Sequence, residues 1–305
     1  MKKNIKPKIK TDNLWCWAFM IPTITLYLLF TGWPIINSFY YATLNWSGLG
    51  VNKDFVGMAN IIAVAKDPYF WNAFFNSFKY MFGIVPLQLM LGLALALIVN
   101  NKALKFSTAY RTLFFLPVVT TASIVGIIMI FILGTDGPVN FIATNLGLID
   151  QPVNWLGDPK YSLVTVILVG TWKGLGTNMI YWLAGLQSIP NELYEAAKVD
   201  GCNRKQTFRH ITLPLIIPIG SVIALLNVVG SLKVFDIIKT MTNGGPFFTT
   251  DVVSTYIYRY AFSSEMGMPR LGYASAAGIF FGITIIIIGF SANKLRTRIK
   301  NNAVL

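Results

Sequence analysis

Residues 187–214 read QSIPNELYEAAKVDGCNRKQTFRHITLP, a charged stretch between two long apolar runs. Pro190 suits the first turn of a helix, because the amide hydrogen that proline lacks has no partner there. Glu192 and Glu195 complement the positive N-terminal end of such a helix. Gly201 suits the left-handed position that closes a helix. The stretch therefore predicts a short helix that ends in a glycine turn.

A second helix is expected directly after the glycine. Asn203, with Gln206 three residues later, has the spacing of a capping box. One face of the first helix is apolar with helical spacing, and consists of Ile189, Leu193, Ala196 and Ala197. Such a helix fits a groove in a partner protein, or lies on the bilayer surface. The glutamates early in the helix disfavour a position on the bilayer surface, because the inner leaflet is negatively charged. The pattern alone still leaves both interpretations open.

The composition around this stretch is that of a membrane protein. Of the 305 residues, 54% are hydrophobic and 12% are charged, against about 25% charged residues in soluble domains. The net charge of +13 would indicate nucleic acid in a soluble protein, but the basic residues here flank apolar runs, so nucleic acid is not expected. Cys16 and Cys202 are the only cysteines and His210 is the only histidine, so neither a disulfide framework nor zinc chemistry is expected. The sequence has no phosphate-binding GxxxxGK[ST] loop, so nucleotide hydrolysis is not expected either.

Six apolar runs are long enough to cross a bilayer as helices, which takes about 20 residues. They are residues 17–39, 74–98, 112–133, 161–186, 214–236 and 272–292. Three of the six carry no full charge; the other three contain Lys79, Lys173, and Lys233 with Asp236. The first run is too long for a cleaved signal peptide and is expected to be retained. The predicted fold class is an all-α, multi-pass membrane protein with six spans.

The distribution of basic residues predicts the orientation, because cytosolic loops are rich in Lys and Arg. With the N-terminus in the cytosol, 16 of the 25 basic residues and four of the 12 acids fall in cytosolic segments, a net +12. The other nine basic and eight acidic residues give +1. The prediction is a cytosolic tail at 1–16, a six-span transmembrane domain at 17–292 that includes the cytosolic loop 187–213, and a second cytosolic tail at 293–305.

The loop also carries a family resemblance. Glu195-Ala196-Ala197, then Asp200-Gly201, Ile211 and Leu213-Pro214 resemble the EAA loop of ABC-importer permeases. Further motifs resemble the carbohydrate-uptake branch, which includes the maltose-transporter permease: Trp172-Lys173, Leu183–Pro190, Phe235-Asp236, Thr242–Pro246, Tyr256–Tyr258 and Ala261-Phe262. The resemblance extends from about residue 17 to 292 and is specific for the superfamily but not for a substrate.

The resemblance implies a type I (MetI-like) permease fold in the cytoplasmic membrane and a set of partners. It implies a heterodimer with a second, homologous permease, two ATP-binding subunits that hold ATP and magnesium, and an extracellular solute-binding lipoprotein that delivers a carbohydrate. The chain itself is expected to bind no cofactor and to catalyse no reaction. The residues implied to couple it to the ATPase are Glu195, Ala196, Ala197, Asp200 and Gly201.

Aligned on the EAA loop and the Gly-Gly-Pro turn, the resemblance also implies a substrate pathway in the fourth and fifth spans. Its residues are Gly170, Lys173, Gly174, Thr177, Asn227, Ser231 and Val234. Polar groups at membrane depth are costly and often functional, yet Asn227 and Ser231 suit helix–helix hydrogen bonds equally well. Lys173 could pair inside the bundle, and Lys233 and Asp236, three apart on one expected helix, could neutralise each other.

Two other classes of protein compete with an importer subunit. A secondary transporter would carry intramembrane carboxylates or broken helices in inverted repeats, and the only acid in the spans, Asp236, lies at an end. A membrane enzyme would need convergent His, Asp, Glu or Cys side chains, which the spans lack. Within the importer interpretation, the sequence leaves the sugar open: a neutral oligosaccharide, an acidic sugar or a glycerol-phosphate type of substrate.

Overall fold

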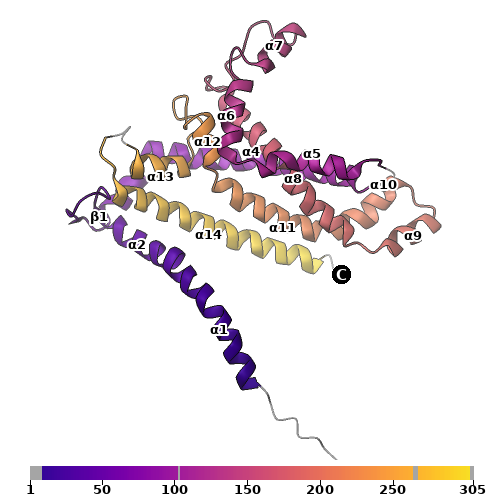
Figure 1. Cartoon of the computed structure of the whole chain (residues 1–305), viewed down its shortest axis with the longest axis horizontal. Coiled ribbons are helices and arrows are strands. Elements are labelled where there is room, and N and C mark those ends of the chain that lie inside the picture. The colour runs from indigo at the N-terminus through magenta and orange to yellow at the C-terminus, as the bar shows by residue number, and fades with distance from the viewer. Residues whose placement is uncertain (1–8, 102–103, 264–266, 303–305) are drawn as a thin grey trace, which may run out of the picture. The chain divides into compact units, whose positions relative to one another are not determined.

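The computed structural model of the chain describes residues 9–101, 104–263 and 267–302. The described residues are mostly helical (Figure 1), which confirms the predicted all-α class. The elements are α1 (Ile9–Tyr27), the π-helical turn η1 (Leu28–Gly32), α2 (Trp33–Ala42), β1 (Leu44–Asn45), β2 (Asp54–Phe55), α3 (Ala59–Lys66), α4 (Pro68–Val99), α5 (Ser107–Val119), α6 (Ala122–Ile132), α7 (Pro138–Asn145), α8 (Ser162–Gln187), α9 (Asn191–Val199), α10 (Arg204–Thr207), the π-helical turn η2 (Phe208–Thr212), α11 (Leu213–Leu232), α12 (Asp236–Met241), α13 (Val253–Phe262) and α14 (Leu271–Asn302).

Five stretches of the described chain are long and apolar enough to cross a membrane as continuous helices, and a bent helix pair brings the number to six. The five are Trp15–Ala42, Pro68–Val99, Ser162–Gln187, Arg204–Leu232 and Leu271–Lys294. Each overlaps a predicted span. The first begins inside the expected tail 1–16, of which residues 1–8 lie outside the described part.

The third predicted span, 112–133, is not a single helix. It consists of α5 and α6, which meet at an angle of 97°. The break lies at two threonines: Thr120 is extended, and the extended Thr121 caps α6 by accepting a hydrogen bond from the amide of Ile124 at 3.4 Å. A threonine N-cap starts a new helix within an apolar run, so the third predicted span consists of two helices rather than one continuous helix.

The fifth predicted span, 214–236, also differs in its ends. The helical path begins at Arg204, runs through the π-helical turn η2 and ends at Leu232. Lys233 caps α11, whereas Asp236 is the first residue of the separate helix α12. The prediction that these two charges share one helix face was therefore wrong. Both are exposed, and they form no ion pair with a described residue.

The chain divides into two compact units, described separately here. The first comprises the described parts of residues 1–66 and 259–279. In it, β1 and β2 pair antiparallel, with Leu44 opposite Phe55. The buried amide of Asn60 donates to the carbonyl oxygens of Ala42 and Leu44, both at 2.9 Å. These bonds hold the turn after α2 against α3.

The second unit comprises the described parts of residues 67–258 and 280–305. Helices α4, α8 and α11 pack along one another in it, with α5 against α8 (Figure 1). Their core consists of Ala96, Val99, Met179, Trp182, Leu183, Leu186, Ile216 and Ile223. Gly176 allows the α5 contact, because a Cβ there would lie 2.9 Å from the Cα of Phe115. Close approach at small residues is how membrane helices associate.

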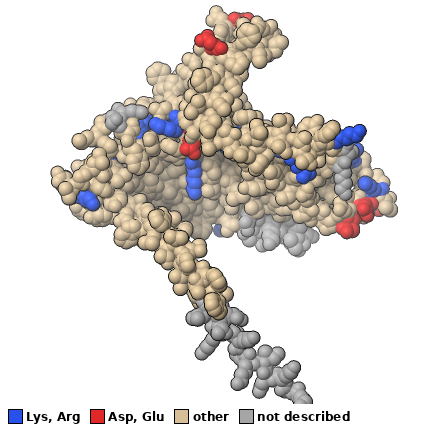
Figure 2. Space-filling view, in the orientation of Figure 1, with Lys and Arg blue, Asp and Glu red and all other residues tan. Residues whose placement is uncertain are grey.

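Charge is unevenly distributed over the second unit. On the face shown in Figure 2, basic and acidic side chains gather at the end that carries α9 and α10, and further charged side chains lie near the middle of the view; much of the remaining surface along the helices is uncharged. Uncharged surface of this kind is suited to lipid.

Candidate functional site

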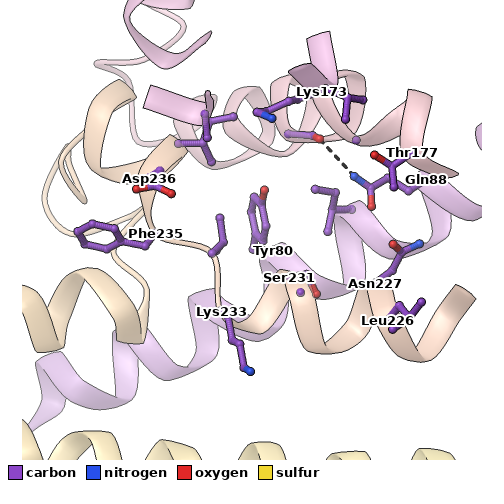
Figure 3. A pocket seen from close by; sticks show the side chains of 18 residues that line it. Tyr80, Gln88, Lys173, Thr177, Leu226, Asn227, Ser231, Lys233, Phe235 and Asp236 are labelled. Atoms are coloured by element: carbon purple, nitrogen blue, oxygen red, sulfur yellow. Dashed lines mark hydrogen bonds between the residues drawn. The ribbon is translucent and has the colours of Figure 1, made fainter. Parts of the chain in front are cut away.

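A cavity of about 340 Å³ lies between α4, α8 and α11 of the second unit, beside the break that separates α11 from α12 (Figure 3). The seven residues implied as a substrate pathway all line it: Gly170, Lys173, Gly174, Thr177, Asn227, Ser231 and Val234. The packing of three helices brings these residues together, although they come from two distant segments. Their role as substrate contacts stays a prediction.

A chain of hydrogen bonds crosses the three helices at this cavity. The side-chain amide of Gln88 on α4 donates to the carbonyl oxygen of Gly170 on α8 at 3.2 Å. The side-chain amide of Asn178, also on α8, donates to Oε1 of Gln88 at 3.4 Å. Asn227 on α11 donates to Oδ1 of Asn178 at 2.6 Å. The amide of Asn227 is thus engaged in helix packing, while its side chain still borders the cavity.

The two glycines of the predicted pathway have a packing role. A Cβ at Gly170 would meet the hydroxyl of Tyr80, and a Cβ at Gly174 would meet the side-chain amide of Gln88. Both large side chains come from α4 and line the cavity. Gly170 and Gly174 therefore let α4 side chains lie directly against the backbone of α8.

The cavity also contains polar groups that are not used in packing. Lys173 is half-buried and forms no hydrogen bond or ion pair with a described residue, and the same holds for Thr177. This removes the intramolecular pairing that the sequence left open for Lys173. The hydroxyl of Ser231 donates to the carbonyl oxygen of Val228 at 2.9 Å, which leaves its oxygen able to accept a further bond.

Lys233 and Asp236 lie at the edge of the cavity. In Figure 3 the side chain of Lys233 points away from Tyr80. Val234 and Phe235 line the wall between the two charges. The chain turns here at the end of α11. The backbone amide of Lys233 donates to the carbonyl oxygen of Gly230 at 3.2 Å, and that of Val234 donates to the carbonyl oxygen of Ser231 at 3.3 Å.

Sequence reasoning missed two of the residues that shape this cavity, Tyr80 and Gln88. Both are buried residues of α4. The signal was present, because Gln88 is a strongly polar residue within the second predicted span and the rule used for the fourth and fifth spans applies to it equally.

The predicted EAA segment has the expected local structure. Gly201 has φ +75°, and the amides of Gly201 and Cys202 donate to the carbonyl oxygens of Lys198 and Ala197 at 3.1 and 2.9 Å. This is the Schellman pattern that ends a helix at a left-handed residue. Asn203 and Gln206 form both bonds of a capping box, at 2.9 and 2.8 Å.

Four of the five residues implied to couple to an ATPase are exposed: Glu195, Ala196, Asp200 and Gly201. Ala197 is 4% exposed and faces its own chain. The predicted apolar face is therefore divided, because Ile189 is also buried while Leu193 is 40% exposed. Tyr194 anchors α9 through a hydroxyl contact with Thr212 at 3.2 Å. The outward side of α9 remains available to a partner.

Among the described residues, no group of three or more His, Cys, Asp or Glu side chains could hold a metal ion. A polar cavity between apolar spans, with an anchored helix exposed at one end of the same spans, is an arrangement typical of a membrane transport protein. Residues 88–301 match the family "Binding-protein-dependent transport system inner membrane component", and the chain belongs to this family. It is a multi-pass translocation subunit of an ABC importer, and ATP hydrolysis belongs to a separate subunit.

The chain is similar over almost its whole length to curated sugar permeases. It is 33% identical to the lactose transport system permease protein LacF of Rhizobium radiobacter, covering 90% of this chain and 91% of that protein. It is 33% identical to the trehalose/maltose transport system permease protein MalF of Thermococcus litoralis, covering 88% and 90%. These matches confirm the resemblance to the carbohydrate-uptake branch.

The fold is similar to that of solved importer structures. One is a crystal structure of a bacterial ABC transporter involved in the import of the acidic polysaccharide alginate. It matches with a TM-score of 0.82 at 29% identity, and the match covers 95% of this chain and 97% of that chain. The MetNI methionine transporter matches with a TM-score of 0.52 at 16% identity, over 75% of this chain and 94% of that chain. The second match shows the fold alone, and it agrees with the expected MetI-like class.

Proposed function

We propose that this chain is one of two homologous permeases in an ATP-driven importer that moves an oligosaccharide or a sugar derivative into the cytosol by alternating access. The observation that carries this is the continuity between cavity and coupling segment. Helices α8 and α11 line the cavity, and their opposite ends connect directly to the α9–α10 segment. Movement of α9 would reach the cavity through two rigid helices, as rigid-body rocking requires.

The chemistry of the cavity supports a carbohydrate. Sugars present many hydroxyl groups, which need hydrogen-bond donors and acceptors at fixed positions. Thr177, Asn227 and Ser231 supply such groups, and Lys173 supplies an unpaired cation. A volume of about 340 Å³ is at the lower end of the usual 300–1,000 Å³ for ligand pockets, which fits a half-site completed by a second permease.

The names of the relatives support the same substrate class. Besides the lactose and trehalose/maltose permeases, the arabinooligosaccharides transport system permease protein AraP of Bacillus subtilis is 29% identical over 92% of this chain. In the alginate transporter, a structure contains the periplasmic protein with bound alginate pentasaccharide. A solute-binding lipoprotein is accordingly the proposed donor of substrate to this chain.

Coupling is proposed to occur through α9. Its exposed strip combines Leu193, Ala196 and Val199 with the carboxylate of Glu195. The proposed importer has two ATP-binding subunits, which hold ATP and magnesium. A groove in one of them would receive α9 of this chain, and a groove in the other would receive the corresponding helix of the partner permease. Coupling of this kind requires residues 187–213 to lie on the same, cytosolic side of the membrane as the ATPase. The two ends of the chain, 1–16 and 293–305, are proposed to lie on that side as well, with 17–292 as the permease domain.

The test is uptake into proteoliposomes that contain this chain, its partner permease and the ATPase, with the loaded binding protein outside and ATP inside. Uptake is expected with the complete set and not when the ATPase, the binding protein or the partner permease is omitted. Glu195→Ala should lower uptake and stimulated hydrolysis together, because it removes a charge-assisted hydrogen bond worth roughly 1.5–3 kcal/mol. Uptake driven by an ion gradient without the ATPase would refute the proposal in favour of a secondary transporter.

A further inference from the structure

A second cavity, of about 320 Å³, lies in the second unit at the end that carries α9. It is separate from the first cavity, since the two share no lining residue. Four helix ends meet around it: the end of α4, the start of α5, the end of α8 and the start of α9. Its polar lining consists of Asn100, Asn101, Ser107, Arg111, Gln187, Asn191 and Tyr194. Each of these groups can donate a hydrogen bond, and among the described residues no acidic side chain lines the cavity.

Arg111 is the unusual member of this lining. It is half-buried, and its Nε is buried without a hydrogen-bond partner. The guanidinium forms no ion pair with any described residue. A buried guanidinium N–H without a hydrogen-bond partner is unfavourable, and the planar set of donors of the guanidinium matches the oxygens of a phosphate. The cavity therefore has the chemistry of an anion site.

The start of α5 reinforces this charge. Ser107 is the first residue of α5 and lines the cavity. Its hydroxyl has no hydrogen-bond partner among the described residues, and the preceding Phe106, with φ 64°, provides no side-chain cap. The free first-turn amides and the positive end of the helix dipole favour an anion close to Arg111.

The position of the cavity indicates the source of the anion. It lies where α4 and α8 end, at Val99 and Gln187, which is the depth of the headgroups on the side proposed to be cytosolic. Basic pockets between transmembrane helices on that side bind anionic headgroups. We propose that this cavity binds the phosphate of an anionic phospholipid and that the bound lipid links α5, whose Val118 lines the first cavity, to the start of α9.

The lipid requirement can be measured on the importer complex in nanodiscs of phosphatidylcholine with or without phosphatidylglycerol. The readouts are phosphatidylglycerol retained on the complex in native mass spectrometry and ATP hydrolysis stimulated by the loaded binding protein. Arg111→Gln removes the guanidinium charge. Lys105→Gln is the matched control, because Lys105 is an exposed basic residue just before α5 and outside the coupling segment, and it lines neither cavity.

Wild type and the Lys105→Gln variant should retain the lipid and hydrolyse ATP faster with phosphatidylglycerol. Arg111→Gln should bind it about tenfold or more weakly and lose the acceleration, while Arg111→Lys keeps part of both. If Arg111→Gln fails to assemble, wild type and Arg111→Lys still test the proposal by their relative lipid retention. Equal retention by wild type and the Arg111 variants would overturn it.

Two other outcomes would assign the cavity differently and overturn the lipid proposal. Inorganic phosphate or glycerol phosphate, added to complexes in phosphatidylcholine alone, could reproduce the whole acceleration in an Arg111-dependent way; the anion would then be soluble. Arg111→Gln could instead release the ATPase equally in both lipid compositions, in which case the partner of Arg111 is a side chain of the ATPase.

Discussion

Replacing Gly201 with alanine isolates the contribution of the turn geometry to coupling. Gly201 has φ +75°, and a Cβ built there would meet nothing within 4 Å. The substitution therefore causes no clash, and its effect is the conformational strain of a left-handed residue, about 1–2 kcal/mol. That free energy corresponds to a roughly 5- to 30-fold change in the ratio of formed to unformed turn. Because the turn sets the direction of α9, coupling should fall while the spans stay folded.

The assay compares purified importer complexes in nanodiscs for retained ATPase and for hydrolysis stimulated by the loaded binding protein. Gly50→Ala is a matched control, because Gly50 has φ +79° and also has nothing within 4 Å of a Cβ, but lies in a different loop. Gly201→Asn should be milder than alanine, since asparagine tolerates the left-handed region. The reasoning is refuted if Gly201→Ala and Gly50→Ala are both coupled like wild type.

Three further expectations concern the cavity, the packing and the topology. Asn227→Ala removes a hydrogen bond between helices worth about 0.6–2 kcal/mol; uptake should fall while assembly is retained, and normal uptake of every accepted substrate would reduce Asn227 to a packing residue. Gly176→Ala places a Cβ 2.9 Å from the Cα of Phe115, so thermal unfolding in detergent should show about 1–3 kcal/mol of destabilisation; Gly289→Ala, with nothing within 4 Å, should not, and equal effects would contradict the packing argument. A cysteine at Asp150 in a cysteine-free background should react with impermeant reagents from the outside, and labelling only from the cytosol would reverse the topology.

The features that could be predicted from the sequence depend on neighbouring residues or on long averages. The left-handed Gly201 and the Asn203–Gln206 box involve residues a few positions apart, so their chemistry is visible in the sequence. The spans are averages over about 20 residues and were located for the same reason. Their ends and breaks were not, because one cap at Thr121 hardly changes a hydropathy average.

The candidate cavity was only partly predictable. The resemblance supplied residues of α8 and α11, but Gln88 meets Asn178 across 90 positions, and Asn178 meets Asn227 across 49. Such pairings follow from how helices pack, which the sequence pattern does not determine. For the same reason, the sequence did not reveal that Tyr80 and Gln88 lie against Gly170 and Gly174.

The central claim is that the cavity between α4, α8 and α11 is the route of the substrate and that nucleotide binding changes the side from which it opens. Thr177→Cys, in a background without Cys16 and Cys202, places a thiol of similar size on the cavity wall. The measurement is the rate at which impermeant thiol reagents label it from each side of the membrane, without nucleotide and in a vanadate-trapped complex. The account predicts labelling from the cytosolic side without nucleotide and from the outer side in the trapped state. A thiol that keeps the same accessibility in both states of an actively transporting complex would contradict it.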